Sequence, residues 1–116
     1  MNDTNWVGRI NELKAVTKAM SKNLIVAEPY SIEPFDLLVQ DPNNPSTFLK
    51  CQVKTLYYRE DRDAFVLYAK KGKNIHYTLD EVDVFLAVFK NAVYWVRHSG
   101  NGEYWAKNPN KKWLKL

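Results

Sequence analysis

The fold is decided by one hairpin-like stretch, FDLLVQDPNNPSTFLKCQVKTL, residues 35–56. Its apolar opening predicts a strand over 35–40, and the two prolines and two asparagines of 41–46 predict a turn, because these residues favour turn backbone angles. The segment 48–56 predicts a second strand. Side chains alternate along a strand, so one face should carry Leu49, Cys51, Val53 and Thr55, and the other Lys50, Gln52 and Lys54.

On the N-terminal side of this stretch, residues 6–22 predict a helix. Apolar residues recur there at steps of three and four, which predicts that one helical face packs against the sheet: Trp6, Ile10, Leu13, Val16 and Met20. Glu12 falls at the edge of that face. A short strand is expected at 24–27.

On the C-terminal side, a charged turn at 59–63 precedes a strand at 64–69 and a basic loop at 70–74. Thr78 and Glu81 have the spacing of a capping box and predict a helix start. Residues 82–89 and 92–97 predict a β-pair whose apolar strands are candidate subunit-interface elements. The order of elements indicates an α/β or α+β fold with a mixed central β-sheet flanked by helices.

Length and composition are those of one globular domain spanning residues 1–116, with 98–116 as a basic, aromatic C-terminal extension. The formal charge of +4 suits a polyanionic partner. In the extension, lysines alternate with aromatics that could stack on bases or, equally, complete the core. No stretch has the length of a membrane span, residues 1–5 do not look like a signal peptide, and Cys51 is alone, so an intracellular setting is expected.

Four polar residues could meet around one divalent cation. Asp36 begins the first strand of the hairpin, Gln52 and Lys54 share a face of the second, and Glu12 can reach them from the helix. Magnesium prefers oxygen ligands, and a bound cation both activates water and stabilises charge on phosphate. A neighbouring lysine adds electrostatic stabilisation. This set is therefore suited to phosphodiester hydrolysis.

With these residues in place, the chain resembles the PD-(D/E)XK nuclease superfamily. An acidic residue that starts one strand and an acid-x-Lys triplet on the next match Asp36 and the triplet Gln52-Val53-Lys54. Residues 8–14 resemble the glutamate-bearing helix of the archaeal Holliday junction resolvase branch, and residues 77–85 resemble a stretch of the group I intron-associated homing endonucleases. The matching stretches lie within residues 6–97.

The resemblance implies a restriction-endonuclease-like core and a Mg²⁺-dependent endonuclease, with Mn²⁺ as a substitute, acting on double-stranded or branched DNA. It implies that Asp36, Gln52 and Glu12 bind the metal and that Lys54 orients water or stabilises the transition state. Glu28 is a secondary metal-site candidate. The basic residues expected to contact DNA are Arg9, Arg59, Arg62, Lys70, Lys71 and Lys73. Cutting both strands implies a homodimer or a higher homo-oligomer, in the cytoplasm of a prokaryotic or phage-infected cell.

Gln52 departs from the superfamily pattern, because an amide ligand brings no negative charge to the metal. The alternative is therefore a catalytically inactive DNA-binding or assembly module that keeps the fold. A third interpretation is a protein-interaction domain with exposed aromatics. Each site residue also has a structural explanation: Glu12 could pair with Arg9, Asp36 could cap a turn, and Gln52 and Lys54 could line the edge of a sheet. His76 and His98 are expected at the surface, and Cys51 in the core.

Overall fold

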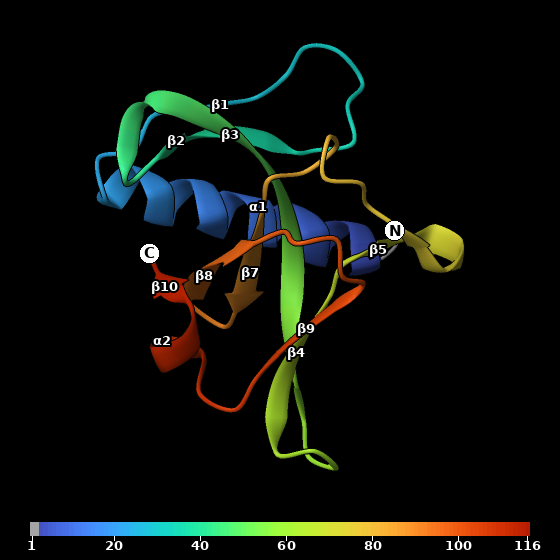
Figure 1. Cartoon of the computed structure of the whole chain (residues 1–116). Helices are drawn as coiled ribbons and strands as arrows, with labels where there is room; N and C mark the ends of the chain where they lie inside the picture. The colour runs from blue at the N-terminus through green and yellow to red at the C-terminus, as the bar shows by residue number, and fades with distance from the viewer. Residues whose placement is uncertain (1–2) are drawn as a thin grey trace.

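The structure is a computed structural model and describes residues 3–116, with side chains from residue 6 onward. One long helix lies against a twisted mixed sheet, and a β-ribbon extends away from the sheet (Figure 1). The elements are α1 (Asp3–Ser21), β1 (Val26–Ala27), β2 (Leu37–Asp41), β3 (Asn44–Arg59), β4 (Ala64–Tyr68), β5 (Lys70–Lys71), the 3₁₀ turn η1 (Gly72–Asn74), β6 (Ile75–His76), β7 (Val84–Phe89), β8 (Ala92–Arg97), β9 (Glu103–Ala106), α2 (Pro109–Lys112) and β10 (Leu114–Lys115).

Strand β3 organises the sheet, because its 16 residues serve two partners in succession. Its first part lies between β2, which is antiparallel, and β7, which is parallel. Its last residues pair with β4, and β4 pairs with β9 to make the ribbon. The path β1-β2-β3-β7-β8-β10 thus combines both strand directions. The predicted α+β fold with a mixed central sheet is confirmed.

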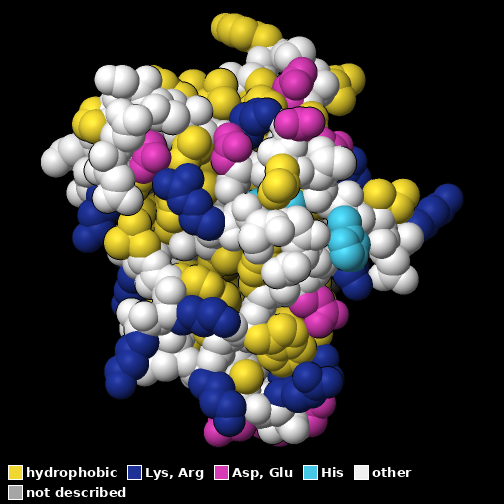
Figure 2. All heavy atoms as spheres, viewed as in Figure 1, with side chains coloured by type: hydrophobic (Ala, Val, Ile, Leu, Met, Phe, Trp, Pro, Cys, Tyr) yellow, Lys and Arg dark blue, Asp and Glu magenta, His cyan; other side chains and the backbone are white. Residues whose placement is uncertain are grey.

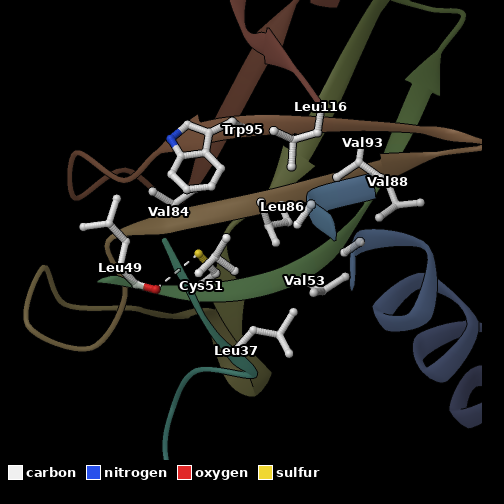
Figure 3. Close-up of a cluster of buried hydrophobic side chains, with 13 residues drawn as sticks. Leu37, Leu49, Cys51, Val53, Val84, Leu86, Val88, Val93, Trp95 and Leu116 are labelled. Atoms are coloured by element: carbon white, nitrogen blue, oxygen red, sulfur yellow. Dashed lines mark hydrogen bonds between the residues drawn. The ribbon is translucent and has the colours of Figure 1, made fainter. Parts of the chain in front are cut away.

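The two faces of β3 build two cores, as the alternation in its sequence predicts. Leu49, Cys51 and Val53 are buried on the face that α1 covers, beside Leu86 of β7 (Figure 3). Leu56 belongs to the second core, on the opposite face, which β4, β9 and the C-terminal segment cover. The prediction that Cys51 lies in the core is confirmed, since it is fully buried.

The prediction of which face of α1 is buried is wrong. The residues that meet the sheet are Asn11, Ala15 and Ala19, all nearly inaccessible, and Val16 only packs at the edge. The other apolar residues of the expected stripe are about half exposed or more: Trp6 (51%), Ile10 (46%), Leu13 (50%) and Met20 (61%). The two alanines let the helix approach closely, and the Asn11 amide donates to Thr55 Oγ1 at 2.9 Å.

The turn between β2 and β3 is tighter than the sequence predicts, because β3 already begins at Asn44. The Asp41 carboxylate accepts the Asn43 amide at 2.9 Å, which closes the turn, and Arg97 approaches Asp41 at 3.2 Å. This turn fixes the register in which Leu37 faces Cys51. That register brings the beginning of β2 beside the middle of β3.

Two further local predictions are corrected. The basic loop 70–74 forms most of a small hairpin, β5-η1-β6. Thr78 and Glu81 do exchange the hydrogen bonds of a capping box, but the chain makes only a turn there, because β7 begins at Val84.

The interface role expected for the strands at 82–97 is also wrong. β7 and β8 run through the middle of the sheet with almost every residue buried, so neither offers a free face.

The C-terminal segment contributes to the sheet, with β9 beside β4 and β10 beside β8. Trp113 packs against the second core, whereas Leu114 is 47% exposed. None of the helices in residues 3–116 combines the length and the hydropathy that a membrane crossing would require. Basic side chains predominate on the lower half of the face in Figure 2, where Figure 1 places the ribbon and α2.

Candidate active site

Asp36 is held immediately before β2 by two backbone contacts with β3. Its own amide donates to the Cys51 carbonyl at 2.9 Å, and its Oδ2 accepts the Val53 amide at 2.9 Å. These two bonds straddle Gln52, so the Asp36 carboxylate lies beside the Gln52–Lys54 segment. The predicted convergence of Asp36 with the second strand is therefore present.

Lys54 is half-buried on the same face of β3 as Gln52, which is also half-buried and pairs in register with Phe85 of β7. The Lys54 ammonium donates to the Lys70 carbonyl at 3.1 Å and lies 5.4 Å from the centre of the Tyr77 ring. These two contacts hold a flexible side chain in one place.

Glu12 lies on α1 and makes the pair with Arg9 that its structural explanation predicted. Arg9 lies 3.1 Å from Glu12 and 3.8 Å from Glu28, so one guanidinium joins two carboxylates. The Glu12 side chain is 31% exposed. Its charge still acts on Asp36. Glu12 is thus both a partner of Arg9 and a neighbour of Asp36.

Burial disfavours the charged forms of both Asp36 and Lys54. Burial raises the pKa of the Asp36 carboxyl; the Val53 amide opposes this, Glu12 adds to it, and Lys54 opposes it. Burial also lowers the pKa of Lys54, against the attraction of Asp36. Both groups are therefore less stable in their charged forms than in water, which is common at functional sites.

The donor set fits a hard divalent cation, although it is sparse. Asp36 and Glu12 supply two carboxylates and Gln52 an amide oxygen, which are ligand types that magnesium accepts. Their mutual repulsion is what a bound cation would relieve. Within residues 6–116, no three His, Cys, Asp or Glu side chains gather in a metal-binding group. A metal here would thus keep several water ligands.

An open pocket of about 350 Å³ adjoins Lys54, between the start of α1 and the strands. It is lined by Val7, Gly8, Asn11, Val53, Lys54, Thr55, Tyr57, Tyr68 and Lys70. Two ammonium groups and two tyrosines on its wall suit an anionic ligand with a flat ring system. The larger groove near Trp95 and Trp113, about 640 Å³, lies on the C-terminal side and includes none of the four candidate residues.

The basic residues expected to contact DNA fall into separate groups. Arg59 and Arg62 lie at the tip of the ribbon and flank the Trp105 ring at 6.0 and 5.1 Å. Arg59 is also held by Asp61 at 2.8 Å. Lys70 and Lys71 belong to β5, next to Lys54, where Lys71 pairs with Glu81.

Lys73 is exposed in η1 with a left-handed backbone (φ 63°). Arg9, on α1, pairs with Glu12 of the same helix and with Glu28, which follows β1. The six residues therefore extend from the site to the tip of the ribbon.

Sequence reasoning missed two aromatic residues beside the site. Tyr77 is nearly buried between the ammonium groups of Lys54 and Lys71, and burial, with the charges of Asp36 and Glu81, raises the pKa of its hydroxyl. His98, expected at the surface, is buried: its ring nitrogens contact the Tyr77 carbonyl at 2.8 Å and the Tyr104 hydroxyl at 2.7 Å. His76 is exposed, as predicted.

Comparison with known proteins shows a similarity in fold to a solved structure. No family model matches the sequence, and neither does any curated protein. The solved structure of a bacterial homing endonuclease, I-Ssp6803I, superposes with a TM-score of 0.67 over all of this chain and 83% of that one, at 19% sequence identity. The chain is therefore similar in fold to a bacterial homing endonuclease.

Proposed function

We propose that this protein is a Mg²⁺-dependent endonuclease of the PD-(D/E)XK superfamily that hydrolyses phosphodiester bonds in double-stranded DNA. The observation that carries the proposal is the Asp36 carboxylate fixed to β3 at the Val53 amide, where the charges of Lys54 and Glu12 both act on it. The likeness in fold to a homing endonuclease supports a homing-type enzyme over a Holliday-junction resolvase.

In this proposal, Asp36, Glu12 and Gln52 hold the metal, with Mn²⁺ able to replace Mg²⁺. A bound ion would supply an acidified water and neutralise charge on the phosphate. Asp36 would help to hold it through a carboxylate fixed to the Val53 amide. Lys54, fixed by the Lys70 carbonyl, presents its ammonium to the phosphate oxygens, where charge develops during hydrolysis.

The DNA would lie across the face that carries the basic groups. Lys70, Lys71 and Lys73 would contact the backbone near the cut, while Arg59 and Arg62 would contact it farther along. At about 3.3 Å per residue, Arg59 lies roughly 17 Å along β3 from Lys54, which is close to half a turn of duplex. Cutting both strands needs two such sites, so a homo-oligomer is part of the proposal, as is an intracellular location.

The test compares wild type with Asp36→Asn and Lys54→Met on plasmid, linear duplex and four-way junctions in Mg²⁺. Asp83→Asn is the matched control, because Asp83 Oδ2 also accepts a backbone amide of β3, that of Lys50, at 2.8 Å. We expect cleavage by wild type and by the control, and a loss of at least roughly 100-fold in the two site variants. Equal cleavage by all four proteins would refute the assigned roles.

Gln52 favours a second candidate, a DNA-binding module that no longer cuts. An amide adds no charge to the metal site, and Arg9 already neutralises Glu12 and Glu28. Binding that weakens with salt, is indifferent to Mg²⁺ and leads to no cleavage of any substrate would select this reading.

A further inference from the structure

The outer face of α1 carries apolar side chains that nothing in the described part of the chain covers. We call this set the outer stripe; it consists of Trp6, Ile10, Leu13 and Met20. At 100° per residue, Ile10 and Leu13 point away from the sheet, opposite the buried Ala15. A contiguous apolar surface of this kind marks an interaction site.

We propose that the outer stripe is the contact between two copies of this chain, packed as an antiparallel helix pair about a twofold axis at Leu13. The stripe is self-complementary around that residue, which lies midway between Trp6 and Met20. Antiparallel pairing brings the Leu13 side chains of the two chains into contact with each other. It also places the Trp6 ring of one chain on the flexible Met20 side chain of the other, a favourable sulfur–aromatic contact.

The area of the stripe fits a stable dimer. A large apolar residue has roughly 200 Å² of accessible surface, so four residues about half exposed present about 400 Å². Interfaces are about 60% apolar, which corresponds to roughly 700 Å² on each partner. That is within the range of a stable protein interface, about 600–1,000 Å² on each partner.

A groove beside the stripe gives the second copy a place to interlock. It measures about 460 Å³, lies between α1 and the β7–β8 turn, and is lined by Ile10, Leu13, Lys14, Thr17, Lys18 and Asn91. The Lys14 ammonium is held on the Lys90 carbonyl at 2.8 Å, so it lies aside from the apolar floor. The groove can therefore receive apolar side chains from the facing helix.

The charged residues at the edges of the outer stripe give the dimer a salt dependence opposite to that of DNA binding. A twofold axis at Leu13 brings the Lys14 and Lys18 edges of both copies together, and it keeps both Glu12 edges on the other side of the dimer. Like charges at the rim repel each other and are screened by salt. The dimer should therefore hold or tighten as salt rises, whereas DNA binding weakens.

The test measures mass by sedimentation equilibrium without DNA, for wild type, Leu13→Asp and the matched control Leu79→Asp. Leu79 is 58% exposed in the turn before β7, so the control adds the same charge outside the stripe. We expect the wild-type and control proteins to form a dimer that tightens with salt. In Leu13→Asp the dimer dissociation constant should rise roughly 100-fold or more, because each dimer would bury two unpaired charges. Circular dichroism verifies that each variant is folded.

A cross-link tests the symmetry directly. Leu13→Cys should oxidise to a covalent dimer, because the two thiols meet on the axis, while Thr17→Cys should not; Cys51 is buried and does not compete. A monomeric wild type, a dimer indifferent to Leu13→Asp, or cross-linking at position 17 instead of 13 overturns the proposal. Binding of the monomer to lipid vesicles through the stripe would also overturn it. Because no readout uses cleavage, these results are independent of the proposed nuclease activity.

Discussion

Replacing Asp36 by Asn should stabilise the protein in the absence of metal while abolishing the proposed cleavage. The amide keeps an oxygen for the Val53 amide but removes a charge that burial and Glu12 disfavour. Because the pKa of Asp36 is raised in the folded state, its protonated form favours folding; this contribution is complete below the unfolded pKa, near 3.8, and is lost as pH rises through the folded pKa. The gain in Asp36→Asn should therefore be present at neutral pH and vanish in acid.

The gain in the free energy of unfolding should be about 0.5–1.5 kcal/mol, as for other substitutions that remove an unfavourable group from a functional site. For a domain of this length, this gain raises the unfolding midpoint by roughly 2–8 °C. Thermal unfolding followed by circular dichroism at pH 7 and pH 3.5 measures it, with Asp83→Asn as the control that keeps an equivalent bond to β3. Added Mg²⁺ at ten times its Kd should stabilise only proteins with Asp36 intact, by about 1.4 kcal/mol. A destabilised Asp36→Asn, or an equal gain in Asp83→Asn, would refute the reasoning.

Two further substitutions test the surroundings of the site. Gln52→Glu adds a third carboxylate, so calorimetry should show Mg²⁺ binding about tenfold tighter or more, and the metal-free protein should unfold at a lower temperature; unchanged affinity would remove Gln52 from the ligand set. His98→Leu leaves the Tyr77 carbonyl without a partner and removes one of the partners of the Tyr104 hydroxyl, which keeps the Ser99 and Asn101 amides; it should cost about 1–3 kcal/mol. His76→Leu, at an exposed position, should change stability by less than about 0.5 kcal/mol. Denaturant unfolding of both histidine variants decides this, and equal losses would contradict the buried network.

The sequence predicts those parts of the fold that depend on local periodicity. The strands of the 35–56 stretch and the pair at 82–97 are found close to where alternation and turn residues place them. The helical face was mispredicted because a three- and four-residue period shows that a helix is amphipathic without showing what each face meets. Here Ala15 and Ala19, which carry little hydrophobic signal, meet the sheet, and the larger residues do not.

The candidate site was predictable in part, because strand alternation is also a local pattern. Gln52 and Lys54 share a face by strand alternation, and Asp36 adjoins them because a single short turn separates the two strands. Tyr77 and His98 left no signal, since His98 meets Tyr77 from 21 residues away and that contact exists only in the folded sheet. Long-range partners of this kind are set by packing, which single-sequence patterns do not encode.

The register of the β2–β3 hairpin is what converts these residues into a site. A slip of one residue moves every side chain of a strand to the opposite face. It would place Gln52 and Lys54 under α1, where Cys51 and Val53 now pack, and would bury a lysine in an apolar core. Because that alternative is so unfavourable, the hydrophobic contacts of Cys51 and Val53 with α1 hold Lys54 beside Asp36. The core packing and the geometry of the candidate site are therefore fixed by the same residues, so substitutions that loosen the first core should disturb the site before they unfold the chain.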